Sequence, residues 1–191
     1  MIYLILSLHF LVGSISHAFE MTGLVNYSIS EISPKPANYV DSNKGVGYSF
    51  FGRLDLGPGQ IESGFLYTPV GVTTTVANQN ITISGSYWLF PVMYRIMVLP
   101  PFISLAAGFD YGLVGNSAIV TGNLNPGLGY KSHFGYQAGI EAVQDVGENL
   151  GAVLDIRYRG GLGDSITLPS ASAATKYNFL VVGVGIQKRL D

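Results

Sequence analysis

Apolar and polar residues alternate along the middle of the chain. One face of residues 103–111 carries Ile103, Leu105, Ala107, Phe109 and Tyr111. The other face carries Ser104, Ala106, Gly108 and Asp110. A period of two predicts a β-strand. The wider stretch 81–112 is long and apolar enough to suggest a membrane helix, but three prolines and Arg95 interrupt it. We therefore interpret residues 81–112 as a β-hairpin.

The same alternation recurs in eight runs, which predict eight antiparallel strands. The runs are Thr22–Ile29, Gly45–Leu56, Gln60–Thr68, Ile81–Met97, Phe102–Gly112, Phe134–Val143, Leu150–Arg159 and Lys176–Arg189. In the fourth run the apolar parity changes near Pro91: Ile81, Ile83 and Tyr87 lead, and then Val92, Tyr94 and Ile96. A β-bulge at Pro91 would explain this change, because proline in a sheet occurs at edges and bulges.

Long and short connections alternate between these runs. The long ones are Ser30–Lys44, Pro69–Asn80, Leu113–His133 and Gly160–Thr175. The short ones are Gly57–Gly59, Val98–Pro101 and Gln144–Asn149. Outer-membrane barrels have long extracellular loops, short periplasmic turns and an even number of strands. The pattern predicts an all-β, eight-stranded, up-and-down transmembrane β-barrel with both ends of the chain on the periplasmic side.

Composition favours an apolar exterior. Of the 191 residues, 48% are hydrophobic and 12% are charged, and the net charge is -2. Soluble domains carry about 25% charged residues. The near-neutral charge argues against a nucleic-acid partner. There is no cysteine, so a disulfide framework and thiolate chemistry are both excluded.

The first residues resemble a secretory signal. An apolar run, Ile2–Val12, is followed by small residues that end in Ser16-His17-Ala18. This predicts cleavage after Ala18, with residues 1–18 as signal peptide and residues 19–191 as one mature barrel domain. No lysine or arginine precedes the apolar run. The alternative interpretation is a buried first strand.

Charged residues of the predicted strands fall on the face opposite the apolar one. This lumen charge network is Arg53, Asp55, Glu62, Arg95, Asp110, Glu141, Asp155, Arg157 and Arg159. The lumen of an eight-stranded barrel is only wide enough for side chains to fill it. We therefore expect a salt-bridged core, and the alternative is a path for protons or small solutes.

Each predicted strand also carries a tyrosine near its long-loop end. The set is Tyr27, Tyr48, Tyr67, Tyr87, Tyr111, Tyr136, Tyr158 and Tyr177. All except Tyr177 share the parity of the apolar face. Amphipathic rings belong where hydrocarbon meets the headgroups, so these residues are predicted to form an aromatic girdle.

Signals of catalysis are weak. His133 is the histidine that remains after signal removal, and it falls in a predicted loop where a solvated side chain is expected. Its neighbour Ser132 is badly placed for a Ser–His pair, and no G-x-S-x-G elbow is present. No metal-binding or dinucleotide motif appears either. We predict a protein that is not an enzyme and that has no catalytic, metal or cofactor residues.

The strand end Ala106–Gly112 (AAGFDYG) and the closing strand Tyr177–Leu190 (YNFLVVGVGIQKRL) carry a family resemblance. The chain resembles the small outer-membrane β-barrel proteins of Gram-negative bacteria, the OmpA/OmpX/OmpW-like group. The resemblance implies a bacterial outer-membrane location, a monomer, contact with outer-membrane lipid and lipopolysaccharide, and insertion by the outer-membrane assembly machinery. Closing strands of the family commonly end in an aromatic residue, whereas this chain ends in Leu190–Asp191.

Three hypotheses for function follow. The first is an integral outer-membrane barrel with a filled lumen and a structural or surface-interaction role, in which the long loops meet an extracellular partner. The second is a narrow channel, or a carrier for a small hydrophobic solute. The third is a secreted, soluble lipocalin-like barrel, which would place its apolar faces inside around a ligand.

Overall fold

A computed structural model describes residues 19–33, 35, 39–42, 44–76, 79–116, 119–121, 129–167 and 175–190. The predicted signal peptide, residues 1–18, lies outside the described residues, and strand β1 begins at Phe19. In these ranges no helix is long and apolar enough to cross a bilayer.

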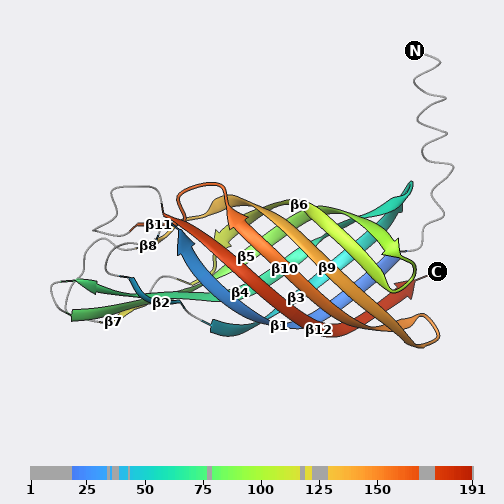
Figure 1. Cartoon of the computed structure of the whole chain (residues 1–191), viewed down its shortest axis with the longest axis horizontal. Helices are drawn as coiled ribbons and strands as arrows, with labels where there is room; N and C mark the ends of the chain where they lie inside the picture. Colours follow the sequence, from blue (N-terminus) through green and yellow to red (C-terminus); the bar gives the residue numbers. More distant parts are fainter. Residues whose placement is uncertain are drawn as a thin grey trace, which may run out of the picture.

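Eight long antiparallel strands form the wall of a closed barrel (Figure 1). They are β1 (Phe19–Ser33), β3 (Lys44–Leu56), β4 (Gly59–Val76), β5 (Gln79–Leu99), β6 (Ile103–Val114), β9 (His133–Gly147), β10 (Leu150–Gly161) and β12 (Lys176–Leu190). Pairing of β1 with β12 joins the first and last strands, and pairing of β4 with β5 completes the ring. The predicted eight-stranded antiparallel barrel is confirmed.

Three short turns lie at one end of the barrel, and three long connections and the extended β4–β5 hairpin lie at the other (Figure 1). The turns are residues 57–58, 100–102 and 148–149. Gly57 and Asn149 have φ values of 62° and 58°. Glycine tolerates this left-handed conformation because it has no Cβ, and asparagine is among the residues that adopt it more readily. The strand β1 starts and the strand β12 ends at the turn end, as predicted.

Four short strands extend the loop end: β2 (Tyr39–Ser42), β7 (Ile119–Thr121), β8 (Gly129–Tyr130) and β11 (Ile166–Thr167). β2 pairs with the outer part of β4, β7 with the outer part of β5, and β8 with β11. The predicted loop Pro69–Asn80 is wrong, since β4 runs to Val76 and β5 starts at Gln79. Its threonines pair across the hairpin, and the Thr73 and Thr82 hydroxyls are 3.0 Å apart. β-branched threonine favours strands, although serine- and threonine-rich stretches resemble loops.

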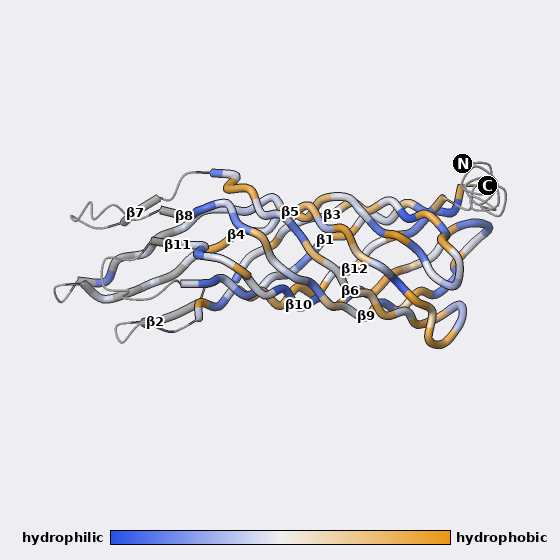
Figure 2. Tube along the Cα trace, turned by 90° about the horizontal axis from the view of Figure 1, so that it is seen from above, coloured by the Kyte–Doolittle hydropathy of each residue, from blue (hydrophilic) through white to orange (hydrophobic). Residues whose placement is uncertain are grey.

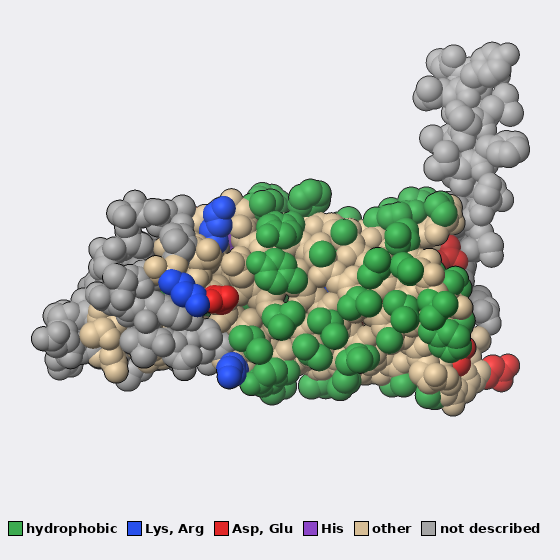
Figure 3. All heavy atoms as spheres, in the orientation of Figure 1, with side chains coloured by type: hydrophobic (Ala, Val, Ile, Leu, Met, Phe, Trp, Pro, Cys, Tyr) green, Lys and Arg blue, Asp and Glu red, His purple; other side chains and the backbone are tan. Residues whose placement is uncertain are grey.

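Apolar side chains of the long strands point outward. Leu154 and Val184 face each other across β10 and β12, and both are exposed. On the face shown in Figure 3 the hydrophobic side chains form a broad band across the barrel, and Figure 2 shows the same part of the chain with alternating hydropathy. The lipocalin-like hypothesis is therefore wrong, because it requires the apolar faces to line the interior.

The register of β5 is continuous through Pro91. Ser63 pairs with Val92 and Leu66 with Leu89 in the same frame, and on the other side Pro91 pairs with Asp110. The predicted bulge at Pro91 is therefore wrong. The ladder between β4 and β5 lacks pairs opposite residues 90 and 91, because proline has no N–H to donate.

Candidate functional site

The barrel lumen is the candidate site, and a charged layer lies at its middle. This charged layer consists of Arg53, Glu62, Arg95, Glu141, Asp155 and Arg157, each at most 2% exposed. The residues come from five strands, β3, β4, β5, β9 and β10. Strand alternation turns all of them inward, where three guanidinium groups meet three carboxylates.

Glu62 is the centre of the charged layer. Its Oε2 accepts from Arg53 Nε at 2.8 Å and from an Arg95 guanidinium nitrogen at 2.7 Å. Its Oε1 lies 2.7 Å from Arg157. One buried carboxylate therefore contacts three arginines. Such charges are tolerable only when every partner is present.

Glu141 and Asp155 contact further nitrogens of the three arginines, while Arg95 Nε has no hydrogen-bond partner among the described residues. Glu141 forms ion pairs with Arg53 and, at 3.1 Å, with Arg95. Asp155 holds Arg157 at 2.6 and 3.0 Å through two nitrogens. The Arg157 guanidinium also lies over the Phe51 ring, 4.0 Å from its centroid. The formal charges of the layer cancel.

A second ion pair lies nearer the loop end. Arg159 binds both carboxylate oxygens of Asp110, at 2.6–2.9 Å. The same guanidinium lies 2.8 Å from His133 Nε2, and Gln137 donates to Asp110 at 3.0 Å. His133 was predicted to be a solvated loop residue, and this prediction is wrong. It is the first residue of β9 and is buried, because the strand begins one residue earlier than the pattern indicated.

The turn end of the lumen holds a further set of polar residues. Glu20 pairs with Arg189 at 2.9 Å, and Gln187 accepts from Arg53 at 2.8 Å. The predicted network omitted Glu20 because the first strand was expected to start at Thr22, and it did not include Gln187 and Arg189, although both lie within the predicted strand Lys176–Arg189. Asp55 was expected in the network, but it is half-buried and accepts from Gln60 at 2.9 Å, away from the arginines.

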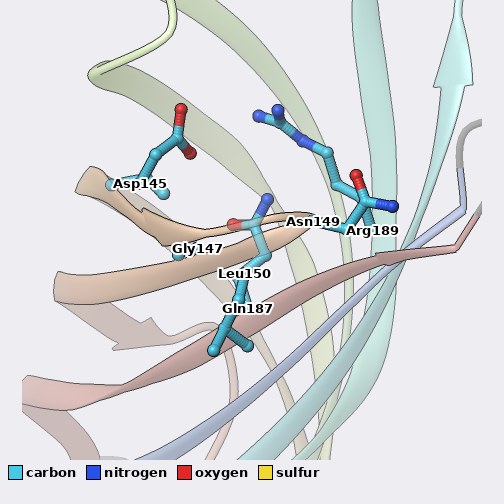
Figure 4. A pocket seen from close by; sticks show the side chains of 8 residues that line it. Asp145, Gly147, Asn149, Leu150, Gln187 and Arg189 are labelled. Atoms are coloured by element: carbon cyan, nitrogen blue, oxygen red, sulfur yellow. The ribbon is translucent and has the colours of Figure 1, made fainter.

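A small pocket opens at the turn end, with a volume of about 100 Å³. Figure 4 shows Asp145, Asn149, Gln187 and Arg189 around it, between the β9–β10 turn and β12. The charged layer lies farther along the lumen. The pocket is therefore a shallow mouth of the barrel.

Two tyrosines assigned to the girdle lie inside the lumen. Tyr87 and Tyr177 are 0% exposed. With Tyr130 and Phe179 they form an aromatic layer on the loop-end side of the charged layer. The centroids of contacting rings in this layer are 5.6–6.4 Å apart. Tyr87 was placed outward on the assumption that parity changed at Pro91. The unbroken register turns Tyr87 inward, and Tyr177 lies on the buried face of β12, so the girdle assignment of both residues is wrong.

The other tyrosines of the predicted girdle face outward: Tyr27, Tyr48, Tyr67, Tyr111, Tyr136 and Tyr158. Tyr48 and Tyr67 stack with centroids 5.1 Å apart, and Trp88 lies 5.1 Å from Tyr67. Trp88 was not included in the prediction. Its presence on the outward face of β5 follows from the same corrected parity.

Segments from two long connections cover the aromatic layer. The Tyr87 hydroxyl lies 2.9 Å from the Lys131 carbonyl and 2.7 Å from that of Ser165. Lys131 pairs with Asp164 at 3.3 Å. The Thr175 N–H donates to Asp164 at 2.8 Å and holds the pKa of this carboxyl below its usual value. Burial raises the pKa of Tyr130 to about 12, so its phenol stays neutral.

The described residues contain no cluster of histidine and carboxylate side chains suited to a metal ion. His133 uses both ring nitrogens on its neighbours, since Nδ1 lies 2.9 Å from the Lys131 carbonyl and Nε2 faces Arg159. The arrangement can hold charges in fixed pairs and exclude water.

A closed barrel with an apolar outer wall and a charged interior is an integral outer-membrane β-barrel. Its location is the bacterial outer membrane. The resemblance to the small outer-membrane barrels of the OmpA/OmpX/OmpW-like group is confirmed at the level of the fold.

Solved structures of this class are similar along nearly the whole chain. The outer membrane protein OprG from Pseudomonas aeruginosa has a TM-score of 0.61 at 12% identity, covering 92% of this chain and 97% of that one. Neisserial surface protein A has a TM-score of 0.56 at 11% identity, covering 90% and 97%. Ail of Yersinia pestis, solved with the heparin analogue sucrose octasulfate, has 0.52 at 14%, covering 89% and 99%. No family profile and no curated protein matches the chain.

Proposed function

We propose that this barrel acts as a non-conducting structural and surface-interacting protein of the outer membrane. The charged layer carries the proposal. Its six side chains are almost inaccessible to water and their charges are matched, so an ion would have to break several buried pairs to pass. Side chains are expected to fill an eight-stranded lumen.

Conductance in planar lipid bilayers tests the proposal. The mature chain should give no steady current, and neither should Arg157→Leu, since the remaining side chains still fill the interior. Reproducible single-channel steps in the wild-type protein, with an ion selectivity that shifts in Arg157→Leu, would establish the channel hypothesis instead.

The surface role is assigned to the loop end of the barrel. There the outer parts of β4 and β5 pair with β2 and β7, and these added strands enlarge the sheet at that end. A protease added to intact cells should cut within Leu113–His133 before it cuts at Gln144–Asn149. Cleavage confined to the short turns would show that the barrel has the opposite orientation, with the short turns outside the cell.

A carrier for a small hydrophobic solute is the second candidate function. The aromatic layer favours it, because Tyr87, Tyr177 and Phe179 give the outer half of the lumen an apolar lining. A fluorescent apolar probe such as N-phenyl-1-naphthylamine should then bind the purified barrel at one site, and Tyr87→Ala should alter its affinity. We expect no saturable binding, because the rings already contact one another.

We also propose that the barrel is a monomer without enzymatic activity, inserted by the outer-membrane assembly machinery. Closure between β1 and β12 supports the monomer, because no unpaired edge of the wall remains to recruit a second barrel. Light scattering of the detergent-solubilised protein should give the mass of one chain plus its micelle.

A further inference from the structure

His133 joins the wall of the barrel to a segment that covers the lumen, and the proposed function does not use it. The side chain is 5% exposed, and its ring stands nearly perpendicular to the Tyr87 ring, with centroids 5.2 Å apart. Its Nδ1 lies 2.9 Å from the Lys131 carbonyl, which also accepts from the Tyr87 hydroxyl at 2.9 Å. One carbonyl of the covering segment is therefore attached to two strands of the wall.

The partners of the two ring nitrogens fix the protonation state of His133. A guanidinium group has donors only, so Nε2, which lies 2.8 Å from Arg159, must be the acceptor. A backbone carbonyl only accepts, so Nδ1 must carry the proton that it donates to Lys131. The neutral imidazole with its proton on Nδ1 meets both conditions. A protonated ring would direct an N–H of its own at the Arg159 guanidinium.

Arg159 has no room to withdraw from a protonated ring. Its Nε and Nη2 bind Asp110, and its guanidinium carbon lies 5.4 Å from the centroid of the Phe179 ring. A Cβ added at Gly135 would lie 2.7 Å from Nη2, so the guanidinium rests directly on the backbone of β9. The repulsion is therefore relieved by movement of the His133 ring, which then leaves the Lys131 carbonyl.

The other charged and titratable groups around the ring are already committed. On β6, Asp110 accepts from Arg159 through both carboxylate oxygens. On the covering segments, Lys131 and Asp164 are exposed and pair with each other at 3.3 Å. On β5, Tyr87 is a phenol that stays neutral in acid and uses its hydroxyl on backbone carbonyls. Among the described residues, Arg159 is the charged group that faces the ring nitrogen.

We propose that His133 is an acid-sensitive latch, in which protonation of the ring releases residues 129–132 from the wall and uncovers the aromatic layer. Imidazole suits this role because it is the side chain that ordinarily changes charge between about pH 5 and 8. The second covering segment stays attached to β12, since the Ser165 N–H donates to the Thr175 carbonyl at 2.8 Å and the Tyr177 N–H donates to the Ser165 hydroxyl at 3.2 Å. The charged layer contains no histidine, so the lumen below stays closed.

Isotope labelling of histidine tests the latch, because a chain that begins at Phe19 contains His133 as its one histidine. In the untagged barrel at neutral pH, nitrogen NMR should show Nδ1 protonated and Nε2 as an acceptor. The Lys131 amide donates to the Ser165 carbonyl at 2.9 Å and reports closure in hydrogen exchange. Below the ordinary imidazole pKa of about 6.5, its protection factor should fall about tenfold per pH unit, because opening takes up one proton. The ring and the amide should report the same transition.

His133→Gln is the matched variant, since a side-chain amide can donate and accept but does not titrate. Its Lys131 protection should not depend on pH over the same range. In the wild type the Thr175 amide is an internal reference, because the Asp164 carboxylate holds it at 2.8 Å. Thr175 should keep its protection until that carboxylate itself is protonated.

A neutral ring with its proton on Nε2 would overturn the proposal. So would protonation of the ring that leaves the Lys131 protection unchanged, and so would the same loss of Lys131 protection in His133→Gln as in the wild type. Conductance is measured separately at each pH. A current that appears in acid while the ring and the Lys131 amide change together would refute only the proposed function.

Discussion

The charged layer and the aromatic layer fill the same lumen in different ways. The charged layer is a set of mutually dependent ion pairs in which Glu62 contacts three arginines. The aromatic layer consists of ring contacts topped by hydroxyl groups that reach the long connections, as Tyr87 reaches Lys131 and Ser165. Ion pairs fail together when one partner is removed, whereas ring contacts fail in proportion to the surface lost. The middle of the barrel should therefore be the less tolerant region.

The largest effect is expected from breaking the charged layer. Arg157→Leu removes the two hydrogen bonds to Asp155 and one of the three arginine partners of Glu62, and it should lower the free energy of unfolding by about 3–5 kcal/mol. Urea unfolding in lipid vesicles, followed by fluorescence of Trp88, measures this change. Lys35→Leu is the control, because it removes an exposed ion pair of small value. Equal stability of the two variants would show that the layer is not a coupled unit.

Both layers lie behind a wall whose outward side chains face lipid. Leu154 is 45% exposed on β10, next to the inward-facing Asp155 and Val153. Leu154→Arg should cost about 2–4 kcal/mol near the middle of the bilayer. Leu180→Asp lies nearer the loop end and should cost less. If Leu154→Arg folds into bilayers as well as the wild type, the outward assignment of this strand face is wrong.

In the aromatic layer, removal of one hydroxyl group should have a moderate effect. Tyr87→Phe keeps the ring contacts but removes the donor to the Lys131 and Ser165 carbonyls, at a cost of about 0.5–1.5 kcal/mol. Hydrogen exchange should quicken around Lys131 and Ser165 while the barrel strands stay protected. Tyr94→Phe, on the outward face of the same strand, serves as the control. Slower exchange near Lys131 in Tyr87→Phe would contradict the role given to the hydroxyl.

Acid should have the smallest effect, confined to the covering segments. The pKa of Asp164 is lowered in the folded protein, so its contribution is present above the ordinary carboxyl pKa and is lost as the pH falls through the lowered value. Protection of the Thr175 amide should therefore decrease in acid, whereas in Asp164→Ala, which has no acceptor, it should be low and independent of pH over that range. Unchanged Thr175 protection in the wild type throughout acidification would refute this link.

The two layers differ in how well the sequence predicts them. Alternation alone predicts that every residue of the charged layer lies in the lumen. A charged side chain on a strand with one apolar face must lie on the opposite face, which points inward. The aromatic layer was missed. Tyrosine fits both an interface and a packed interior, and an apparent change of parity near Pro91, which the register does not contain, assigned Tyr87 to the wrong face.

The alternating pattern by itself determined the number of strands, the side on which the apolar residues lie, and the end that carries the long connections. These features are local, since each follows from a period of two and from the spacing of turns. The tertiary structure alone decided which charged side chains form pairs and which strands extend beyond their predicted ends. Glu62 and Arg157 lie far apart in sequence and are joined by closure of the ring, and His133 and Glu20 enter the lumen because neighbouring strands extend the ladder past the ends of their own patterns. Pairing across a closed sheet is a long-range property, so no single segment encodes it.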